Sequence, residues 1–112
     1  MGVQCTKKGR SLVCSMSGEL DLVGAAEFRA EVQGWFRRYE SLKNIILDLS
    51  DVEFVDSSGL GAILGRYKQV SGMGGKLLVI GLRPNVRRVF EFSGVLKLVQ
   101  EAESEARALA VV

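Results

Sequence analysis

Two short, continuous apolar runs constrain the fold of this chain more than any other feature. Residues 44–49 and 77–80 are rich in Ile, Leu and Val, which is typical of strands covered on both faces of a sheet. Between them, residues 58–71 carry apolar side chains at the spacing of a helix. A strand, a helix and a second strand in this order predict an α/β fold.

The flanking segments extend this pattern in both directions. Residues 3–7 and 12–20 predict a hairpin that turns near Gly9 and Arg10, and a third helix is predicted between Pro84 and Gly94. Residues 101–111 begin with acids and continue with alanines, as a capping helix does. The first helix carries one apolar stripe, formed by Phe28, Val32, Trp35, Phe36 and Tyr39. We expect a single α/β domain over residues 1–112, with a mixed sheet of four to five strands and about four helices.

Composition and charge exclude several classes of function. The net charge is +2, and basic and acidic residues are spread along the whole chain, which argues against a nucleic-acid binder. No apolar run approaches the ~20 residues that span a bilayer, so we expect no membrane segment. The first ten residues lack the apolar stretch of a signal peptide, and we therefore expect a cytoplasmic protein.

The chain contains no histidine and only two cysteines, Cys5 and Cys14. A Ser-His-Asp or Cys-His couple is therefore impossible, which argues against an enzyme of the hydrolase type. The ligands are too few for a zinc site, and we expect neither a metal nor a cofactor. A tight turn in the hairpin would place Cys5 opposite Cys14, close enough to bridge, although two packed thiols are the expected state in the cytoplasm.

The segment Asp56-Ser57-Ser58-Gly59 lies where the central strand passes into the second helix. Asp56 and Ser57 are good N-cap residues, because their side-chain oxygens accept hydrogen bonds from free amides of the first turn. A well-capped helix alone would explain this motif. A functional interpretation needs support from the helix that follows.

That helix has an unusual distribution of side chains. Its sheet-facing side is predicted to carry Leu60, Ile63, Leu64, Tyr67 and Val70. The opposite side, which is almost bare, is predicted to carry Ser58, Gly61, Ala62, Gly65 and Gln69. Glycine inside a helix costs about 1 kcal/mol relative to alanine, so two on one exposed face require a reason. Either a partner protein or another element of the same chain would explain the close approach they permit.

A hydroxyl at the head of such a face is well placed as a switch. Phosphorylation of Ser58 would add about −1.5 to −2 charges and three acceptor oxygens. The helix N-terminus would tolerate this charge, whereas a binding surface made for small neutral groups would not. Modification would then block binding while the fold remains intact.

Nucleotide binding is the main alternative from another class. The glycines at positions 59, 61 and 65 follow a strand and open a helix, but the third is one residue late for a dinucleotide-binding fingerprint. The sequence Gly74-Gly75-Lys76 lacks the spacing and the hydroxyl of a P-loop. A small nucleotide-binding or hydrolytic protein using Ser58 is therefore a remote interpretation.

Three segments together resemble a known family. They are Gly18-Glu19-Leu20-Asp21, Asp56-Ser57-Ser58-Gly59-Leu60-Gly61, and Ile63-Leu64-Gly65-Arg66-Tyr67-Lys68-Gln69. They resemble the bacterial STAS-domain anti-sigma factor antagonists, most closely the branch that acts on sporulation sigma F. The resemblance covers nearly the whole chain. The Asp-Ser-Ser-Gly motif is found across the family, whereas the segment from Gly61 to Gln69 makes the match specific.

The resemblance implies a partner-switching cycle. The unphosphorylated antagonist binds an anti-sigma factor that is also a serine kinase, and so indirectly frees the sigma factor. The kinase phosphorylates Ser58, which ends binding, and a serine phosphatase resets the protein. Ser57 corresponds to the unmodified neighbour, and Asp21 matches an aspartate that contributes to kinase recognition. An antagonist in a general-stress sigma pathway shares this logic and stays open as the alternative.

Site residues follow from these two arguments. The phosphorylation site is Ser58, and no residue is expected to be catalytic or to bind a metal. The expected partner-binding residues are Asp21, Asp56, Ser57, Gly59, Gly61, Ala62, Gly65 and Gln69.

Overall fold

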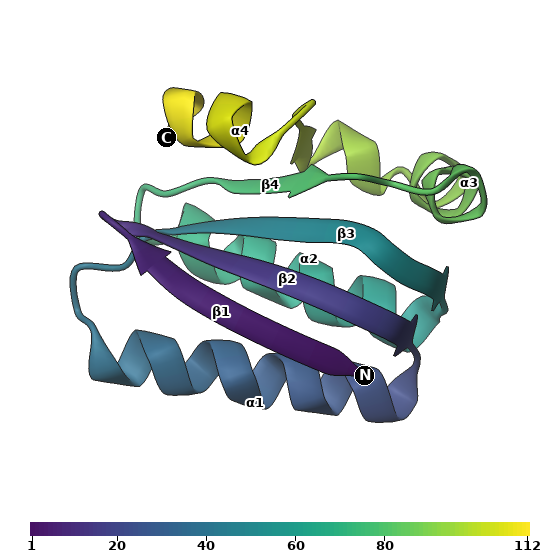
Figure 1. The fold of residues 1–112 in the computed structure, drawn as a ribbon, viewed down its shortest axis with the longest axis horizontal. Helices are drawn as coiled ribbons and strands as arrows, with labels where there is room; N and C mark the ends of the chain where they lie inside the picture. Colours follow the sequence, from purple (N-terminus) through teal and green to yellow (C-terminus); the bar gives the residue numbers. More distant parts are fainter.

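The computed structural model describes residues 1–112 as a five-stranded sheet with helices on both faces (Figure 1). The strands are β1 (Gly2–Lys8), β2 (Ser11–Leu20), β3 (Asn44–Val55), β4 (Leu77–Ile80) and β5 (Gln100–Glu101). The helices are α1 (Leu22–Arg38), α2 (Ser57–Ser71), α3 (Pro84–Ser93) and α4 (Glu105–Val111), and a 3-10 turn covers Val95–Lys97.

The strands follow one another across the sheet in the order β1-β2-β3-β4-β5. Strand β1 pairs with β2 in the antiparallel sense, and every other pair is parallel. Parallel neighbours need a crossover connection, and α1, α2 and α3 supply these three crossovers. The predictions of an α/β fold and of a mixed sheet with about four helices are confirmed.

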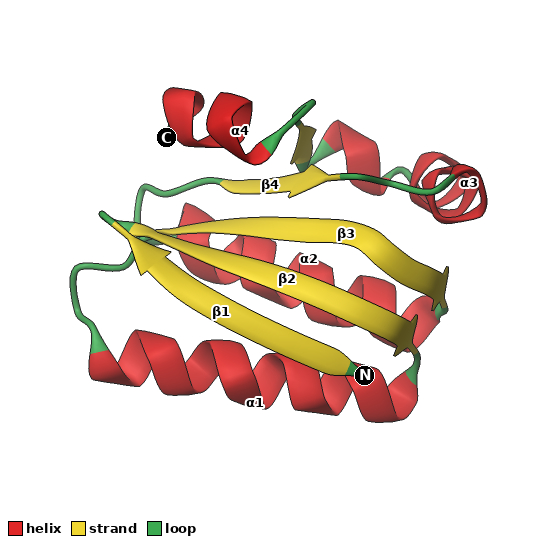
Figure 2. Ribbon diagram, viewed as in Figure 1, coloured by secondary structure: helices red, strands yellow, loops and turns green.

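Successive side chains of the central strands point to opposite faces of the sheet, and this divides the core into two clusters. Ile45 and Leu47 of β3 contact the larger cluster under α1, α2 and α3, whereas Ile46 contacts the smaller cluster under α4. Leu77 and Leu78 of β4 divide in the same way. Figure 2 shows α1 and α2 on one face of the sheet and α4 beyond the other. The continuous apolar runs of β3 and β4 are therefore strands buried on both faces, as predicted.

Two predicted boundaries are wrong. The central strand was expected to end at Leu49, but β3 continues to Val55, because residues 51–55 stay paired with the second half of β2 through two register shifts. The last helix was expected from residue 101, but Glu101 pairs with β4, and α4 begins only after Ser104. The Ser104 hydroxyl accepts from the amide of Arg107 and so caps this helix.

Candidate functional site

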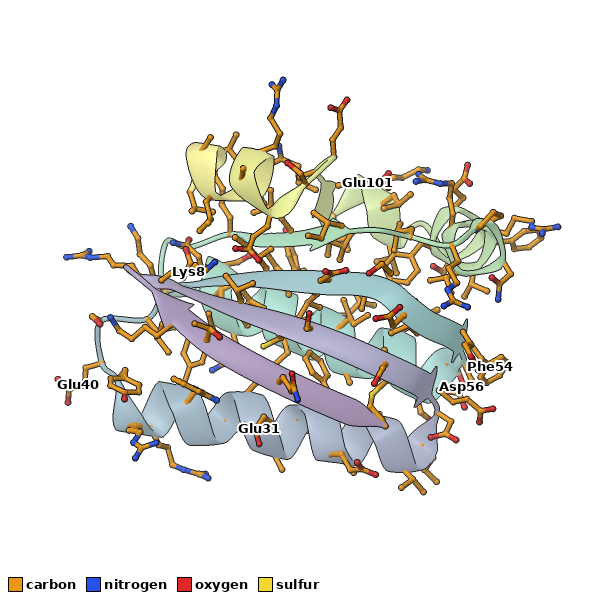
Figure 3. All side chains as sticks on the ribbon, in the orientation of Figure 1. Lys8, Glu31, Glu40, Phe54, Asp56 and Glu101 are labelled. Carbon is orange, nitrogen blue, oxygen red and sulfur yellow. The ribbon has the colours of Figure 1, made fainter.

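Two helix N-termini lie together at one end of the sheet. Leu20 of β2 pairs with Val55 of β3, so the residues that follow them, Asp21 and Asp56, leave the sheet side by side. Asp21 Oδ1 accepts from the amide of Gly24 at 2.9 Å, and Asp56 Oδ1 accepts from the amide of Gly59 at 3.0 Å. Each aspartate is thus the N-cap of its helix. Figure 3 shows Asp56 at this end of the molecule.

Gly59 is buried and lets α2 start directly against β2. A Cβ atom at this position would lie 2.2 Å from the carbonyl oxygen of Leu20. Gly24 has the same place in α1, where a Cβ would lie 2.3 Å from the carbonyl oxygen of Glu19. Gly59 was expected to contact a partner, but its burial makes it a packing residue that sets the position of the helix.

Ser57 and Ser58 are the first two residues of α2. Ser57 is exposed, Ser58 is half-buried, and neither hydroxyl forms a hydrogen bond within the chain. Asp56 rather than Ser57 provides the cap. Both hydroxyls lie beside the positive end of the helix dipole, which favours a negative group there. The Asp56 carboxylate lies at the same helix end and opposes a further negative charge.

The exposed side of α2 is bare, as the sequence predicts. A Cβ atom added to Gly61 or to Gly65 would meet no atom within 4 Å. No other element of the chain packs there, so the alternative of an internal contact is wrong. We call the surface of α2 that Ser58, Gly61 and Gly65 define the open face.

Two residues predicted for the open face lie elsewhere. Ala62 is 6% exposed and belongs to the larger core cluster. Gln69 accepts from Arg66 Nε at 3.0 Å and donates to Gln33 Oε1 of α1 at 3.3 Å, so it links the two helices. The reason is that α1 packs beside α2 and buries a flank that the helical wheel assigns to solvent.

Arg66 is a feature that the sequence analysis missed. It is 8% exposed, and its Nη1 has no hydrogen-bond partner. Burial, with a smaller contribution from the charge of Arg29, lowers the pKa of Arg66 below its usual value. The spacing of four between Ala62, Arg66 and Val70 was the signal that could have shown its burial.

Exposed apolar side chains surround this end of the sheet. Leu22 and Val23 follow Asp21 and are 71% and 66% exposed, while Phe54, two residues before Asp56, is 48% exposed. Figure 3 shows Phe54 next to Asp56. Single exposed apolar residues are common on protein surfaces, but three beside two helix N-termini suit a surface that contacts another protein.

Comparison with known proteins identifies the family. The STAS domain model matches residues 3–108. The chain belongs to the STAS domain family. It is 37% identical over 98 residues to an anti-sigma F factor antagonist of Paenibacillus polymyxa, which covers 88% of this chain and 83% of that protein.

Solved structures agree with this assignment. The anti-sigma factor antagonist SpoIIAA in its unphosphorylated form superposes with a TM-score of 0.83 and 28% identity, covering 96% of this chain and 93% of that one. The phosphorylated form of SpoIIAA, a Bacillus cell fate determinant, gives a TM-score of 0.75 and 27% identity, covering 97% of both chains. The predicted resemblance to STAS-domain antagonists is therefore confirmed.

No three side chains of His, Cys, Asp or Glu gather where they could hold a metal ion. None of the helices combines the length and the apolar character needed to cross a bilayer.

Of the basic residues around α3, Arg87 forms a bidentate pair with Glu101, and Arg83 donates to the Ser50 carbonyl. Both arginines are thus already engaged within the chain.

Proposed function

We propose that this protein is a phosphorylation-controlled antagonist of an anti-sigma factor. The observation that carries the proposal is the free hydroxyl of Ser58 at the head of the open face, where Gly61 and Gly65 present no side chain. The anti-sigma F factor antagonist of Paenibacillus polymyxa and the two forms of SpoIIAA support the same role. The protein acts by binding, not by catalysis.

In the unphosphorylated state, the open face receives the anti-sigma factor. Because Gly61 and Gly65 lack side chains, a backbone of the partner can approach the helix closely. The exposed side chains of Leu22, Val23 and Phe54 add apolar contact area around it. Asp21 and Asp56 hold the two helix N-termini in place and present carboxylates to the partner.

Phosphorylation of Ser58 ends this contact. The phosphate adds about −1.5 to −2 charges at the head of the open face, where a partner would have to desolvate them. The free amides of the first helical turn donate hydrogen bonds to the phosphate, so the fold of the antagonist is preserved. The anti-sigma factor is the serine kinase in this proposal, and a serine phosphatase restores the binding form.

The proposed partner pathway is that of sporulation sigma F, which is released when the antagonist occupies the anti-sigma factor. The 37% identity to an anti-sigma F factor antagonist supports this pathway over a general-stress pathway. The site of action is the cytoplasm, where sigma factors and their regulators meet.

Replacing Gly65 by leucine tests whether the open face binds the partner. We expect Gly65→Leu to fold normally, because the Cβ of the added side chain meets no atom within 4 Å. Its affinity for the cognate anti-sigma factor should fall at least tenfold, equivalent to about 1.4 kcal/mol. Isothermal titration calorimetry measures the affinity, and circular dichroism checks the fold.

Gly34→Leu is the matched control for this test. Gly34 is also an interior helix position with nothing within 4 Å of an added Cβ, but it lies on the exposed side of α1. We expect its affinity to stay at the wild-type value. Equal affinities for both variants would show that the open face does not contact the partner.

A further inference from the structure

The two cysteines of the chain face each other across the β1–β2 hairpin. The hairpin closes through a two-residue turn, residues 9–10, after which Lys8 pairs with Ser11 and Cys5 pairs with Cys14. Hydrogen-bonded and non-hydrogen-bonded pairs alternate from such a turn, and the alternation makes Cys5–Cys14 a non-hydrogen-bonded pair. Its Cα atoms are therefore expected about 4.5 Å apart, within the range of disulfides.

In this register the two cysteine side chains lie in contact. Cys5 Sγ and Cys14 Sγ are 2.6 Å apart, closer than two sulfur atoms in ordinary van der Waals contact, and both residues are free thiols. The next pair on the same face of the hairpin is Val3 and Met16. Met16 belongs to the larger core cluster, and Val3 packs against it. The two sulfurs are therefore placed to bond to each other within one chain once an oxidant is supplied.

The two thiols differ in access. Cys14 is fully buried, whereas Cys5 on the edge strand is only partly buried. The hydrogen bond with Cys5, followed by burial, raises the pKa of Cys14 above its usual value, which makes Cys14 the slower of the two thiols to react with an oxidant. Cys5 is consequently the sulfur that meets an oxidant from solvent, and Cys14 is the resolving thiol beside it.

We propose that Cys5 and Cys14 are a reversible oxidation site that forms an intramolecular disulfide, with a peroxide as the oxidant. Cys5 attacks one peroxide oxygen, which converts its thiol to a sulfenic acid and releases water when the oxidant is hydrogen peroxide. Cys14 then attacks the sulfenic sulfur, and its thiol proton leaves with the hydroxyl group as a second water. A dithiol reductant returns both thiols.

The bond would act on the edge of the sheet and not on the site at Ser58. Strand β1 pairs only with β2, and Cys5 is near its middle. A disulfide there links this edge strand covalently to its only neighbour. It also restricts the conformations of the unfolded chain, which stabilises the folded state. We therefore expect oxidation to raise the urea midpoint of unfolding relative to the reduced protein.

Intact-mass spectrometry of the full chain after treatment with hydrogen peroxide tests the proposal. We expect a monomer lighter by about two hydrogen masses (~2 Da), no thiol reactive in denaturant, and recovery of both thiols with dithiothreitol. The urea midpoint should rise on oxidation and return on reduction. A monomer with both thiols still reactive, a disulfide-linked dimer, or an unchanged urea midpoint would contradict the proposal.

Two variants assign the roles of the thiols. In Cys14→Ala, Cys5 should stop at a sulfenic acid that dimedone traps. In Cys5→Ser, the rate at which Cys14 is oxidised should be at least tenfold lower than the rate for Cys5 in Cys14→Ala. Cys5→Ser changes a partly exposed position, so it remains informative even where Cys14→Ala weakens the core. Equal oxidation rates in the two variants would contradict the assignment of Cys5 as the first thiol to react.

Discussion

A Ser58→Ala variant will stay bound to its anti-sigma factor when ATP is added, whereas the wild-type chain will be released. The alanine removes the only hydroxyl that we assign to the switch and leaves the open face unchanged. Ser58→Asp should bind about a hundredfold more weakly than wild type, equivalent to about 2.8 kcal/mol, because it puts a charge at the head of that face. Surface plasmon resonance with and without ATP measures both effects.

Ser57→Ala is the matched control, because Ser57 is the neighbouring hydroxyl on the same helical turn. Once bound, it should be released by ATP like the wild-type protein, because the hydroxyl of Ser58 is intact. Release of Ser58→Ala by ATP, or failure of Ser57→Ala to be released, would place the switch at a residue other than Ser58.

Gly59→Ala will destabilise the protein by about 3 kcal/mol, in the range of overpacked cores. The added Cβ would lie 2.2 Å from the Leu20 carbonyl oxygen and 2.7 Å from Leu20 Cγ, so α2 and β2 must separate. Urea denaturation followed by circular dichroism measures the loss. Because α2 carries Ser58, partner binding should weaken as well.

Gly61→Ala provides the comparison, two residues further along the same helix. Its added Cβ meets no atom within 4 Å, so the helix should gain about 0.5–1 kcal/mol of stability. The two substitutions are chemically identical and are expected to have opposite signs. A loss of stability of similar size in both variants would show that the close approach at Gly59 is not the cause.

The elements were predictable where a local pattern decides them. The buried runs of β3 and β4 and the Asp56 cap each depend on a few neighbouring residues, and each prediction is confirmed. The end of β3 was not predictable in this way. The continuous apolar run stops at Leu49, because Ser50 and Asp51 are two polar residues in succession, and the pairing with β2 continues the strand to Val55.

In the candidate site, too, features that depend on local sequence were predictable, and features that depend on tertiary packing were not. The bare surface at Gly61 and Gly65 follows from helical spacing and is observed. Ala62 and Gln69 were misplaced because the position of α1 beside α2 is a tertiary fact, which no periodicity within α2 encodes. Exposure of Phe54 likewise depends on where β3 ends relative to the neighbouring elements.

Mapping the phosphate by mass spectrometry, after incubation with the cognate anti-sigma kinase and ATP, tests the central claim most directly. Our account predicts one phosphate, on Ser58, with Ser57 unmodified and with the complex dissociated in proportion to the modification. A phosphate on Ser57, or no phosphate under conditions in which the kinase is active, would contradict it.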